Sequence, residues 1–420
     1  MNARDTSNRM RGLRPLLAAL AATASCSAWA EDPSPWSIGV TQSLTRDSNV
    51  YRLNNGLEPL DGKGRGDTYS STGLIGGLDQ SIGRQHFYGT ANVRYNKYLD
   101  HDDLSNTSYG LNAGWDWTSI WNLSGGVNVS ANQSLAQLDG NSSVQQTQGA
   151  GRNLVKTDQI GANIGWGGTG LLSVQGAWTH SRVRYSLPSQ FASESSGDSG
   201  SLGTYYNISP DLTAGVAFRL TRTEQPQAVQ STSEGRNVDL SLNWRHSVQT
   251  GVNARLSWTH QTNAGGGNQD FDGLTGSLAA TWAPTAKLGF SVAYNRDAGT
   301  NGTFFNVPAS SGPSGSMPAT TVLIQNSQVA NSLSLGATYA ATAKIGVTAG
   351  YTYRSAKVGD FANNTYDDTL QSASLGASWA ITRAWQLGCN LSHEKRDTGA
   401  TLGVAYTANV IGCSAQFTLR

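Results

Sequence analysis

The chain has 420 residues, of which 29 are Lys or Arg, 28 are Asp or Glu and 49 are Gly, and only 14% are charged. A net charge of +1 leaves no basic excess for nucleic acid, so we expect no nucleic-acid partner. The 12 Trp and 15 Tyr recur along the whole chain in alternating segments, which argues against a disordered protein.

Residues 1–30 have the pattern of a secretory signal peptide. A basic start, an apolar stretch over 16–24 and a small-residue cleavage sequence follow one another, carried by Arg4, Arg9, Arg11, Arg14 and Ala28-Trp29-Ala30. We expect cleavage before Glu31 and a single mature domain over 31–420. Lipidation of Cys26 is the alternative, although Thr23 stands where lipoprotein signals favour Leu. No later stretch approaches the roughly 18 apolar residues that a membrane helix needs.

After Glu31, apolar residues alternate with Gly, Ser, Thr and Asn at a period of two, which predicts β-strands. In residues 288–295, Leu288, Phe290, Val292 and Tyr294 share one face, and small or polar residues form the other. The same alternation occupies residues 238–244, 252–258, 333–339, 345–353 and 375–379.

The connections between these segments alternate in length, as in outer-membrane barrels with short periplasmic turns and long external loops. Short turns fall near Gly83-Arg84, Ser119-Ile120, Gly167-Gly168, Ser209-Pro210, Gln249-Thr250, Ala283-Pro284, Thr342-Ala343 and Ile381-Thr382. Longer polar links cover about 45–67, 99–106, 137–152, 186–198, 225–235, 262–270, 297–327, 355–367 and 397–402. Eight turns and nine loops predict an all-β, transmembrane antiparallel barrel of about 18 strands. The weak pattern over 69–80 leaves room for an error of one hairpin.

Aromatic residues predict two interfacial belts. Tryptophans flank the short turns: Trp36, Trp115, Trp117, Trp121, Trp166, Trp244, Trp282, Trp379 and Trp385. Tyrosines occupy the outer ends: Tyr95, Tyr98, Tyr109, Tyr185, Tyr294, Tyr351 and Tyr353. A soluble sheet covered by aromatics is the alternative. Phe417, three residues before the end of the chain, gives weak support for the terminal signal that the outer-membrane assembly machinery reads.

The motifs with catalytic or metal-binding potential favour neither an enzyme nor a metal or cofactor site. Gly197-Asp198-Ser199-Gly200 matches a chymotrypsin-like nucleophile sequence, but we expect a small-residue loop there because no His has the matching setting. The six His lack a convergent nucleophile. Residues 100–103 and 265–270 offer oxygen ligands for calcium, but as single copies they favour solvated loops.

The predicted inward face is mostly Gly, Ser, Thr and Asn, with isolated charges that are pore candidates: Arg94, Asp116, Arg219, Asp239, Arg245, Arg255, Arg354 and Glu394. Two interpretations stay open for these charges. They pair across neighbouring strands and stabilise the wall, or the excess of Arg favours anionic solutes such as an acidic glycan. Folding the last hairpin about Thr401 brings Cys389 and Cys413 together, either as a disulfide or as two buried thiols.

Three segments within residues 41–117 carry a family resemblance: residues 44–53 (LTRDSNVYRL), 78–85 (LDQSIGRQ) and 94–98 (RYNKY). They resemble the EpsL-type proteins of exopolysaccharide biosynthesis operons, a group within the outer-membrane β-barrel porins. The resemblance implies an outer-membrane barrel for polysaccharide export or assembly, acting as a polar channel or a docking component. Its partners would be outer-membrane lipid, exopolysaccharide and periplasmic export proteins.

Two other functions stay open. The chain is a general diffusion porin, or it is a non-conducting scaffold of a polysaccharide-synthesis complex. In the scaffold, the loop over 297–327 would plug the barrel. None of these functions requires enzymatic activity.

Overall fold

A computed structural model describes residues 34–59, 62–136, 152–167, 170–226, 231–264, 270–299, 327–359, 365–399 and 405–419. Residues 1–33 lie outside this part of the chain, so the signal peptide and the Cys26 alternative stay predictions. Residues Trp36–Arg420 form one unit, and its described residues are almost all strand.

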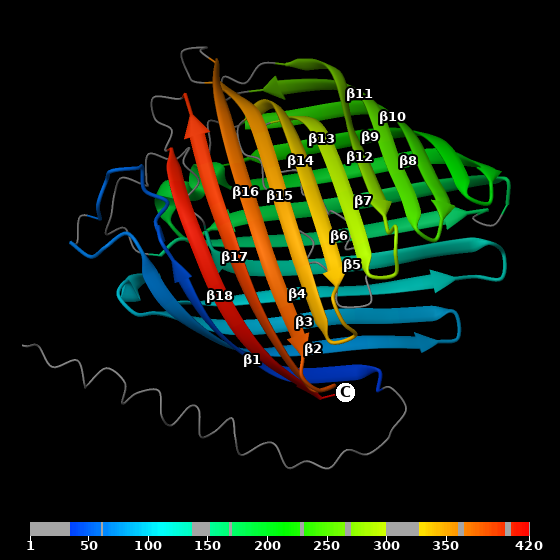
Figure 1. Ribbon diagram of the computed structural model, residues 1–420. Coiled ribbons are helices and arrows are strands. Elements are labelled where there is room, and N and C mark those ends of the chain that lie inside the picture. The colour runs from blue at the N-terminus through cyan, green and yellow to red at the C-terminus, as the bar shows by residue number, and fades with distance from the viewer. Residues whose placement is uncertain are drawn as a thin grey trace, which may run out of the picture. The chain divides into compact units, whose positions relative to one another are not determined.

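The strands follow one another in the barrel in chain order (Figure 1). The first nine are β1 (Trp36–Asp47), β2 (Asp67–Ile82), β3 (Gln85–Tyr98), β4 (Asn106–Thr118), β5 (Leu123–Leu135), β6 (Leu154–Trp166), β7 (Leu172–Tyr185), β8 (Ser195–Ser209) and β9 (Leu212–Gln225). The others are β10 (Ser231–Ser247), β11 (Thr250–Ala264), β12 (Phe271–Trp282), β13 (Leu288–Gly299), β14 (Ser327–Ala340), β15 (Ile345–Gly359), β16 (Thr365–Ala380), β17 (Trp385–Thr398) and β18 (Tyr406–Leu419).

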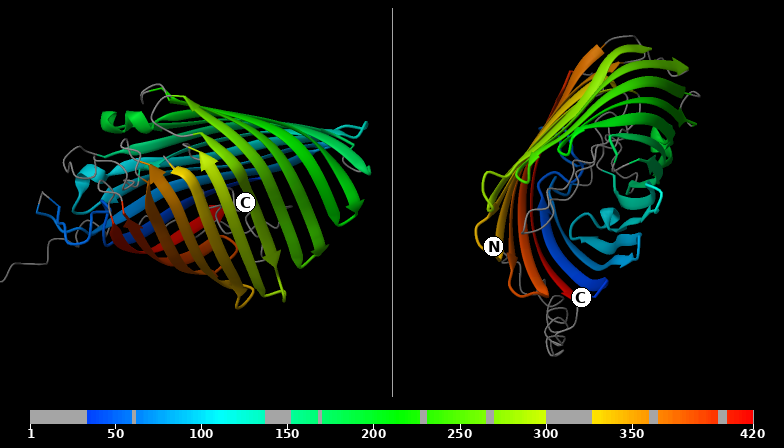
Figure 2. Two further views of the ribbon diagram at one scale, coloured as in Figure 1. Left: turned by 90° about the horizontal axis from the view of Figure 1, so that it is seen from above. Right: turned by 90° about the vertical axis from the view of Figure 1, so that its right-hand side faces the viewer.

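Every strand pairs antiparallel with its neighbours, and β1 pairs with β18 as well as β2, so the 18-stranded sheet closes on itself. The views of Figure 2 show the strands running around a common interior. This confirms the predicted barrel and its strand number. The weakly patterned stretch over 69–80 lies within the uninterrupted strand β2, so no hairpin is added or lost there.

The alternation in sequence becomes two chemically different faces. Large apolar side chains on every strand point outward and stay exposed, for example Leu202 at 64%, Leu44 at 57% and Leu256 at 50%. Soluble monomers rarely expose a continuous apolar patch beyond a few hundred Å². This apolar belt, which surrounds the whole barrel, is typical of barrels that lie in lipid.

The short and long connections lie at opposite ends of the barrel, which we call the turn end and the loop end. The predicted tryptophans lie at the turn end, where Trp36, Trp121 and Trp166 are 57%, 78% and 58% exposed. The tyrosines lie toward the loop end, but two of them do not join an outer belt because they fall on the inward side of their strands. Tyr98 on β3 is 7% exposed and stacks on Tyr69 at 4.7 Å between ring centroids. Tyr185 on β7 lies two residues after the buried Val183 and opposite Val155.

One predicted loop is wrong. Residues 197–200 lie within β8 and pair with β7 and β9. Strands at the loop end extend beyond the apolar belt, and there the outward residues are charged, as in the pair of Arg222 and Glu224 at 2.8 Å. Such polar strand ends have the composition of loops, which explains why the predicted links over 186–198, 225–235 and 355–367 are longer than the observed ones.

Two short 3₁₀ segments interrupt the loop end, η1 (Asp102–Leu104) and η3 (Pro188–Ser193). In the described part of the chain, no helix is long and apolar enough to cross a membrane.

Candidate functional site

The candidate site is the inner wall of the barrel. Alternation from the exposed apolar residues places all eight predicted pore charges on this wall, among Gly, Ser, Thr and Asn. The structure brings three of them together on β9, β10 and β11 and draws a fourth, Glu394, into a different cluster at the loop end. The remaining four lie apart on other strands or at the turn end.

Arg219, Asp239 and Arg255 form what we call the wall cluster. Arg219 donates two hydrogen bonds to the Asp239 carboxylate, from Nε at 2.8 Å and from Nη2 at 3.1 Å. Register places Asp239 between the two arginines, since Arg219 lies opposite Asn237 on β10 and Arg255 lies opposite Ser241. One carboxylate therefore lies between two guanidinium groups, and only that of Arg219 binds it. Within the described residues, the Nε atom of Arg255 is buried without a hydrogen-bond acceptor.

The other pore candidates are spread around the wall. Arg94 on β3, Asp116 on β4 and Arg245 on β10 are exposed, and none forms an ion pair with another described residue. Arg354 on β15 lies opposite Ser332 and Leu370. Arg219 therefore follows the first interpretation and pairs across neighbouring strands, whereas Arg94, Arg245 and Arg255 form no ion pair among the described residues. The preference for anionic solutes stays a prediction.

A second group of inward charges lies at the loop end, and we call it the mouth cluster: Asp47, Arg52, Asp368, Glu394, Arg396 and Tyr406. Its centre is Arg52, whose Nη1 lies 2.7 Å from Asp47 and whose Nε lies 3.2 Å from Glu394. The guanidinium also lies 5.9 Å from the centroid of the Tyr406 ring. Burial by itself lowers the pKa of Arg52, but the two carboxylates outweigh it and raise the pKa above its ordinary value. Arg52 therefore stays charged.

The mouth cluster is buried, and its side chains are joined by hydrogen bonds. The Tyr406 hydroxyl donates to Glu394, and Arg396 holds Asp368 through two bonds of 2.8 and 3.1 Å. Arg396 lies directly opposite Tyr406 in the β17–β18 ladder, which joins the two pairs. Arg52 is 4% exposed and Asp368 is 3% exposed. Buried charges of this kind are tolerated only when paired and hydrogen-bonded.

Arg52 comes from the link after β1, so the mouth cluster fixes that link against the inner wall. Asn49 continues the anchoring, because its side-chain amide donates to the Leu53 and Thr407 carbonyls at 3.0 and 3.2 Å. Arg52 has a left-handed backbone with φ 53°. That conformation costs a residue other than glycine roughly 1–2 kcal/mol, which the ion pairs offset. The first external link thus folds inward beside β17 and β18.

Next to it, Asp67 at the start of β2 receives hydrogen bonds from the link after β3. The backbone N–H of His101 donates to Asp67 at 2.8 Å, and the His101 ring Nδ1 lies 3.2 Å from the same carboxylate, with both side chains 0% exposed. Tyr51 packs edge-on against the His101 ring at 5.1 Å. Two external links are therefore fixed to each other as well as to the wall.

Of the mouth cluster, the alternation in the sequence predicts only Glu394 as a pore charge. The other five members were not predicted: Asp47, Arg52, Asp368, Arg396 and Tyr406. The alternation that identified Glu394 also places Arg396 on the same face two residues later, and it places Asp368 inward on β16. Both fell within or beside stretches interpreted as loops. No comparable signal exists for Arg52, because it lies outside any strand.

The motifs considered for catalysis and calcium have other contacts. Asp198 points outward and pairs with His180 at 3.0 Å, so Ser199 next to it faces the opposite side of β8. In the 100–103 stretch, Asp102 binds Lys97 at 2.6 Å and Asp103 accepts from Tyr51. Within the described residues, no group of three His, Cys, Asp or Glu side chains has metal-binding geometry. Residues 265–269 lie outside the described part.

Cys389 on β17 and Cys413 on β18 are cross-strand partners on the outward face. Their sulfur atoms are joined at 2.15 Å, with 4.0 Å between the Cα atoms.

Comparisons with known proteins give structural similarity only. No protein-family profile matches the sequence, and no characterised protein has a significantly similar sequence. Among solved structures, OccK5 (OpdH) of Pseudomonas aeruginosa has a TM-score of 0.46 at 12% identity, covering 92% of this chain and 98% of that one. OccAB4 of Acinetobacter baumannii has a TM-score of 0.44 at 11% identity, covering 92% and 100%. A BenF-like porin from Pseudomonas fluorescens Pf-5 has a TM-score of 0.45 at 11% identity, covering 91% and 99%.

Proposed function

We propose that the chain is an outer-membrane channel whose inner wall favours anionic solutes. The observation that carries the proposal is the division of the barrel into two faces. The outer face is an exposed apolar belt with tryptophans at the turn end. The inward side chains are mostly small and polar, and several arginines lie among them. Lipid is the solvent that fits the first face, and water fits the second. In this arrangement the turn end faces the periplasm.

The preference for anions follows from the unequal neutralisation of the wall charges. Asp239 is bound by Arg219, Glu394 by Arg52 and Asp368 by Arg396. Among the predicted pore charges, three arginines (Arg94, Arg245 and Arg255) lack a carboxylate in ion-pair contact within the described residues, against one carboxylate without a cation, Asp116. An anion passing the wall cluster therefore meets a positive stretch of the inner wall, and charges of one sign that line a channel raise the local concentration of the opposite ion.

The family resemblance sharpens this proposal toward an acidic exopolysaccharide or its assembly. A uronic acid or other carboxylated sugar has the charge for Arg255 and hydroxyl groups for the surrounding Ser, Thr and Asn. The mouth cluster supports a selective channel over a wide general porin, because it fixes the first external link against the wall. The general diffusion porin and the non-conducting scaffold remain the alternatives. The 300–326 stretch considered as a plug lies outside the described residues.

Planar-bilayer recordings under a salt gradient test the channel. We expect a reversal potential that indicates anion preference and that shifts toward cations in Arg255→Gln. The Asp239→Asn variant should shift it the opposite way, because it removes the carboxylate between Arg219 and Arg255. Arg222→Gln is the matched control, since Arg222 lies on the outward face of β9. Absence of conductance in every form would support the scaffold, and unchanged selectivity in all variants would support a general porin.

A deletion strain tests the polysaccharide. Loss of surface polysaccharide with normal permeability to small antibiotics supports export or assembly. Normal polysaccharide with reduced solute uptake would contradict it and favour a diffusion porin.

A further inference from the structure

The junction of β12 and β13 comes apart at the loop end. Their ladder runs from Trp282 opposite Phe290 to Gly276 opposite Arg296 and stops there, although β12 begins at Phe271 and β13 continues to Gly299. The end of β13 instead follows β14, with a register irregularity between Asp297 and Gly299. Such bulges bend a strand and increase its twist, which explains why β13 leaves β12.

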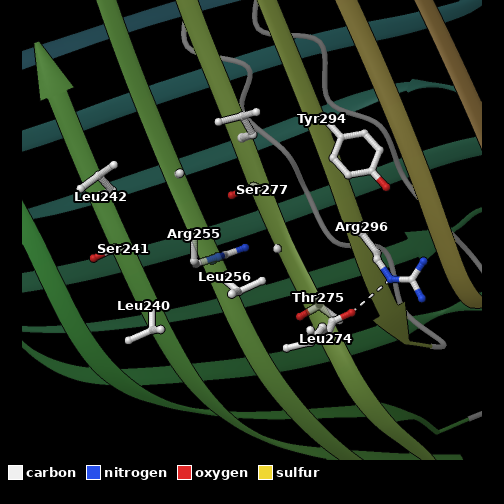
Figure 3. Close-up of a pocket in the computed structure, with 13 residues that line it drawn as sticks. Leu240, Ser241, Leu242, Arg255, Leu256, Leu274, Thr275, Ser277, Tyr294 and Arg296 are labelled. Atoms are coloured by element: carbon white, nitrogen blue, oxygen red, sulfur yellow. Dashed lines mark hydrogen bonds between the residues drawn. The ribbon is translucent and has the colours of Figure 1, made fainter. Parts of the chain in front are cut away.

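A groove of about 440 Å³ lies beside this parting, on the outward face across β10 to β13. Its outward lining is apolar. Leu240, Leu242, Leu256, Leu274 and Tyr294 are labelled in Figure 3, and Leu278 completes the lining. The groove is deepest at Ala254 and Gly276, because these two outward positions carry a small side chain or none, whereas the neighbouring outward positions carry leucine. A side chain cannot replace the hydrogen of Gly276, since a Cβ would lie 2.4 Å from the Arg255 carbonyl oxygen.

A single cation stands at the loop end of the groove. Arg296 reaches across the parting, and its Nε donates to the Leu274 carbonyl at 3.1 Å (Figure 3). Its Nη1 lies 3.4 Å from the Asn331 side-chain oxygen, which also accepts from the Tyr294 hydroxyl at 3.0 Å. The guanidinium is thus oriented by neutral acceptors and is not paired with a carboxylate among the described residues.

We propose that this groove holds an acyl chain of a phosphate-bearing lipid, with the lipid phosphate on Arg296. The inference rests on the proposed membrane location, because the groove must open into lipid. An apolar groove with the Arg296 guanidinium at its loop end complements an amphiphile that has an apolar chain and an anionic head group. The volume lies within the roughly 300–1,000 Å³ of ordinary ligand pockets. A second copy of the barrel would need a broad complementary surface, whereas this feature is narrow and charged at one end.

Native mass spectrometry of the detergent-folded barrel tests the site with dioleoylphosphatidylglycerol and, for comparison, zwitterionic dioleoylphosphatidylcholine. We expect one retained phosphatidylglycerol per barrel. Arg296→Gln should weaken the phosphatidylglycerol adduct roughly tenfold, about the size of one charge-assisted hydrogen bond, and remove the preference over phosphatidylcholine. Ala254→Leu should abolish retention of both lipids, because the new side chain fills the floor.

Two matched controls separate the groove from the general surface. Arg236→Gln removes another outward arginine, on β10, and Ala337→Leu enlarges another outward alanine, on β14, and both should bind like the wild type. Equal adducts in all variants would overturn the site, as would displacement of the lipid by inorganic phosphate alone. A dimer lost in Ala254→Leu would assign the groove to a second copy and also overturn the proposal. Circular dichroism checks that each variant is folded.

The outcomes for the two proposals differ. If the protein were soluble without detergent, the outer-membrane channel itself would fail. A barrel that folds in detergent, conducts ions and retains lipid independently of Ala254 and Arg296 would contradict the lipid site alone.

Discussion

The barrel contains two junctions that are opposite in construction, β1–β18 and β12–β13. The first joins the two ends of the chain and pairs without interruption from Ile38 opposite Leu419 to Asp47 opposite Val410. It continues beyond the strands, where the Ser48 N–H donates to the Asn409 carbonyl at 2.9 Å. The second joins strands that follow one another through a short turn, and yet it parts after Gly276 and Arg296.

Closeness in sequence therefore does not determine which junction is complete. At β1–β18 the loop end is held by buried ion pairs through Arg52, and the first external link extends the ladder. At β12–β13 the loop end has, among the described residues, one exposed side-chain bond, from Arg296 to the Leu274 carbonyl. Side-chain chemistry at the loop end decides whether a strand pair continues past the apolar belt.

Removing the centre of the mouth cluster should have the largest effect. Arg52→Ala leaves the Asp47 and Glu394 carboxylates buried without their cation, and breaking such a pair costs about 3–5 kcal/mol. Urea unfolding in lipid vesicles, followed by tryptophan fluorescence, measures the loss. Arg46→Ala is the control, since Arg46 lies on the outward face of β1 next to Asp47 and makes an exposed hydrogen bond to Thr68. Equal stability of the two variants would show that the mouth cluster does not fasten the β1–β18 junction.

The disulfide next to this junction comes second. Cys389 and Cys413 are 24 residues apart, and closing a loop of this size stabilises a fold by about 3 kcal/mol in the chain-entropy description. Replacing both by Ala should lower the unfolding free energy by that order, and a reducing agent should do the same to the wild type only. Peptide mapping without reduction shows the bond directly, and recovery of both residues as free thiols would contradict it.

A smaller effect is expected from Tyr406→Phe, which keeps the ring under Arg52 and removes only the hydroxyl that donates to Glu394. Leaving a buried acceptor without one of its donors costs about 1–3 kcal/mol. The same urea titration applies, with Tyr95→Phe as the control because Tyr95 is 52% exposed on the outer face. A loss as large as that of Arg52→Ala would show that the hydroxyl, and not the ion pair, dominates the cluster.

The sequence was sufficient for the barrel and its strand number because alternation is local: Leu288, Phe290 and Val292 reveal their shared face without any partner. It was insufficient for the mouth cluster, since Arg52 meets Glu394 across 342 positions and no local pattern signals that contact. It was misleading at Asp198, where an outward polar strand end has the composition of a loop. The sequence also does not predict that β12 and β13 separate, because the alternation of β12 continues through Leu274, beyond the last residue pair of the β12–β13 ladder.

The smallest expected change is the one that tests the open junction itself. Arg296→Ala removes the only side-chain bond across the parting among the described residues, and a net hydrogen bond contributes about 0.5–1.5 kcal/mol. Global stability should therefore barely change, but amide hydrogen exchange over 271–275, already faster than over 38–47 in the wild type, should accelerate further. The reason is that exchange from a poorly paired edge follows local opening and not global unfolding. Arg236→Ala is the control, and it should leave the exchange rates over 271–275 and over 38–47 unchanged. Equal protection of these two segments in the wild type would contradict the prediction, because β12 and β13 would then stay paired to their ends in lipid.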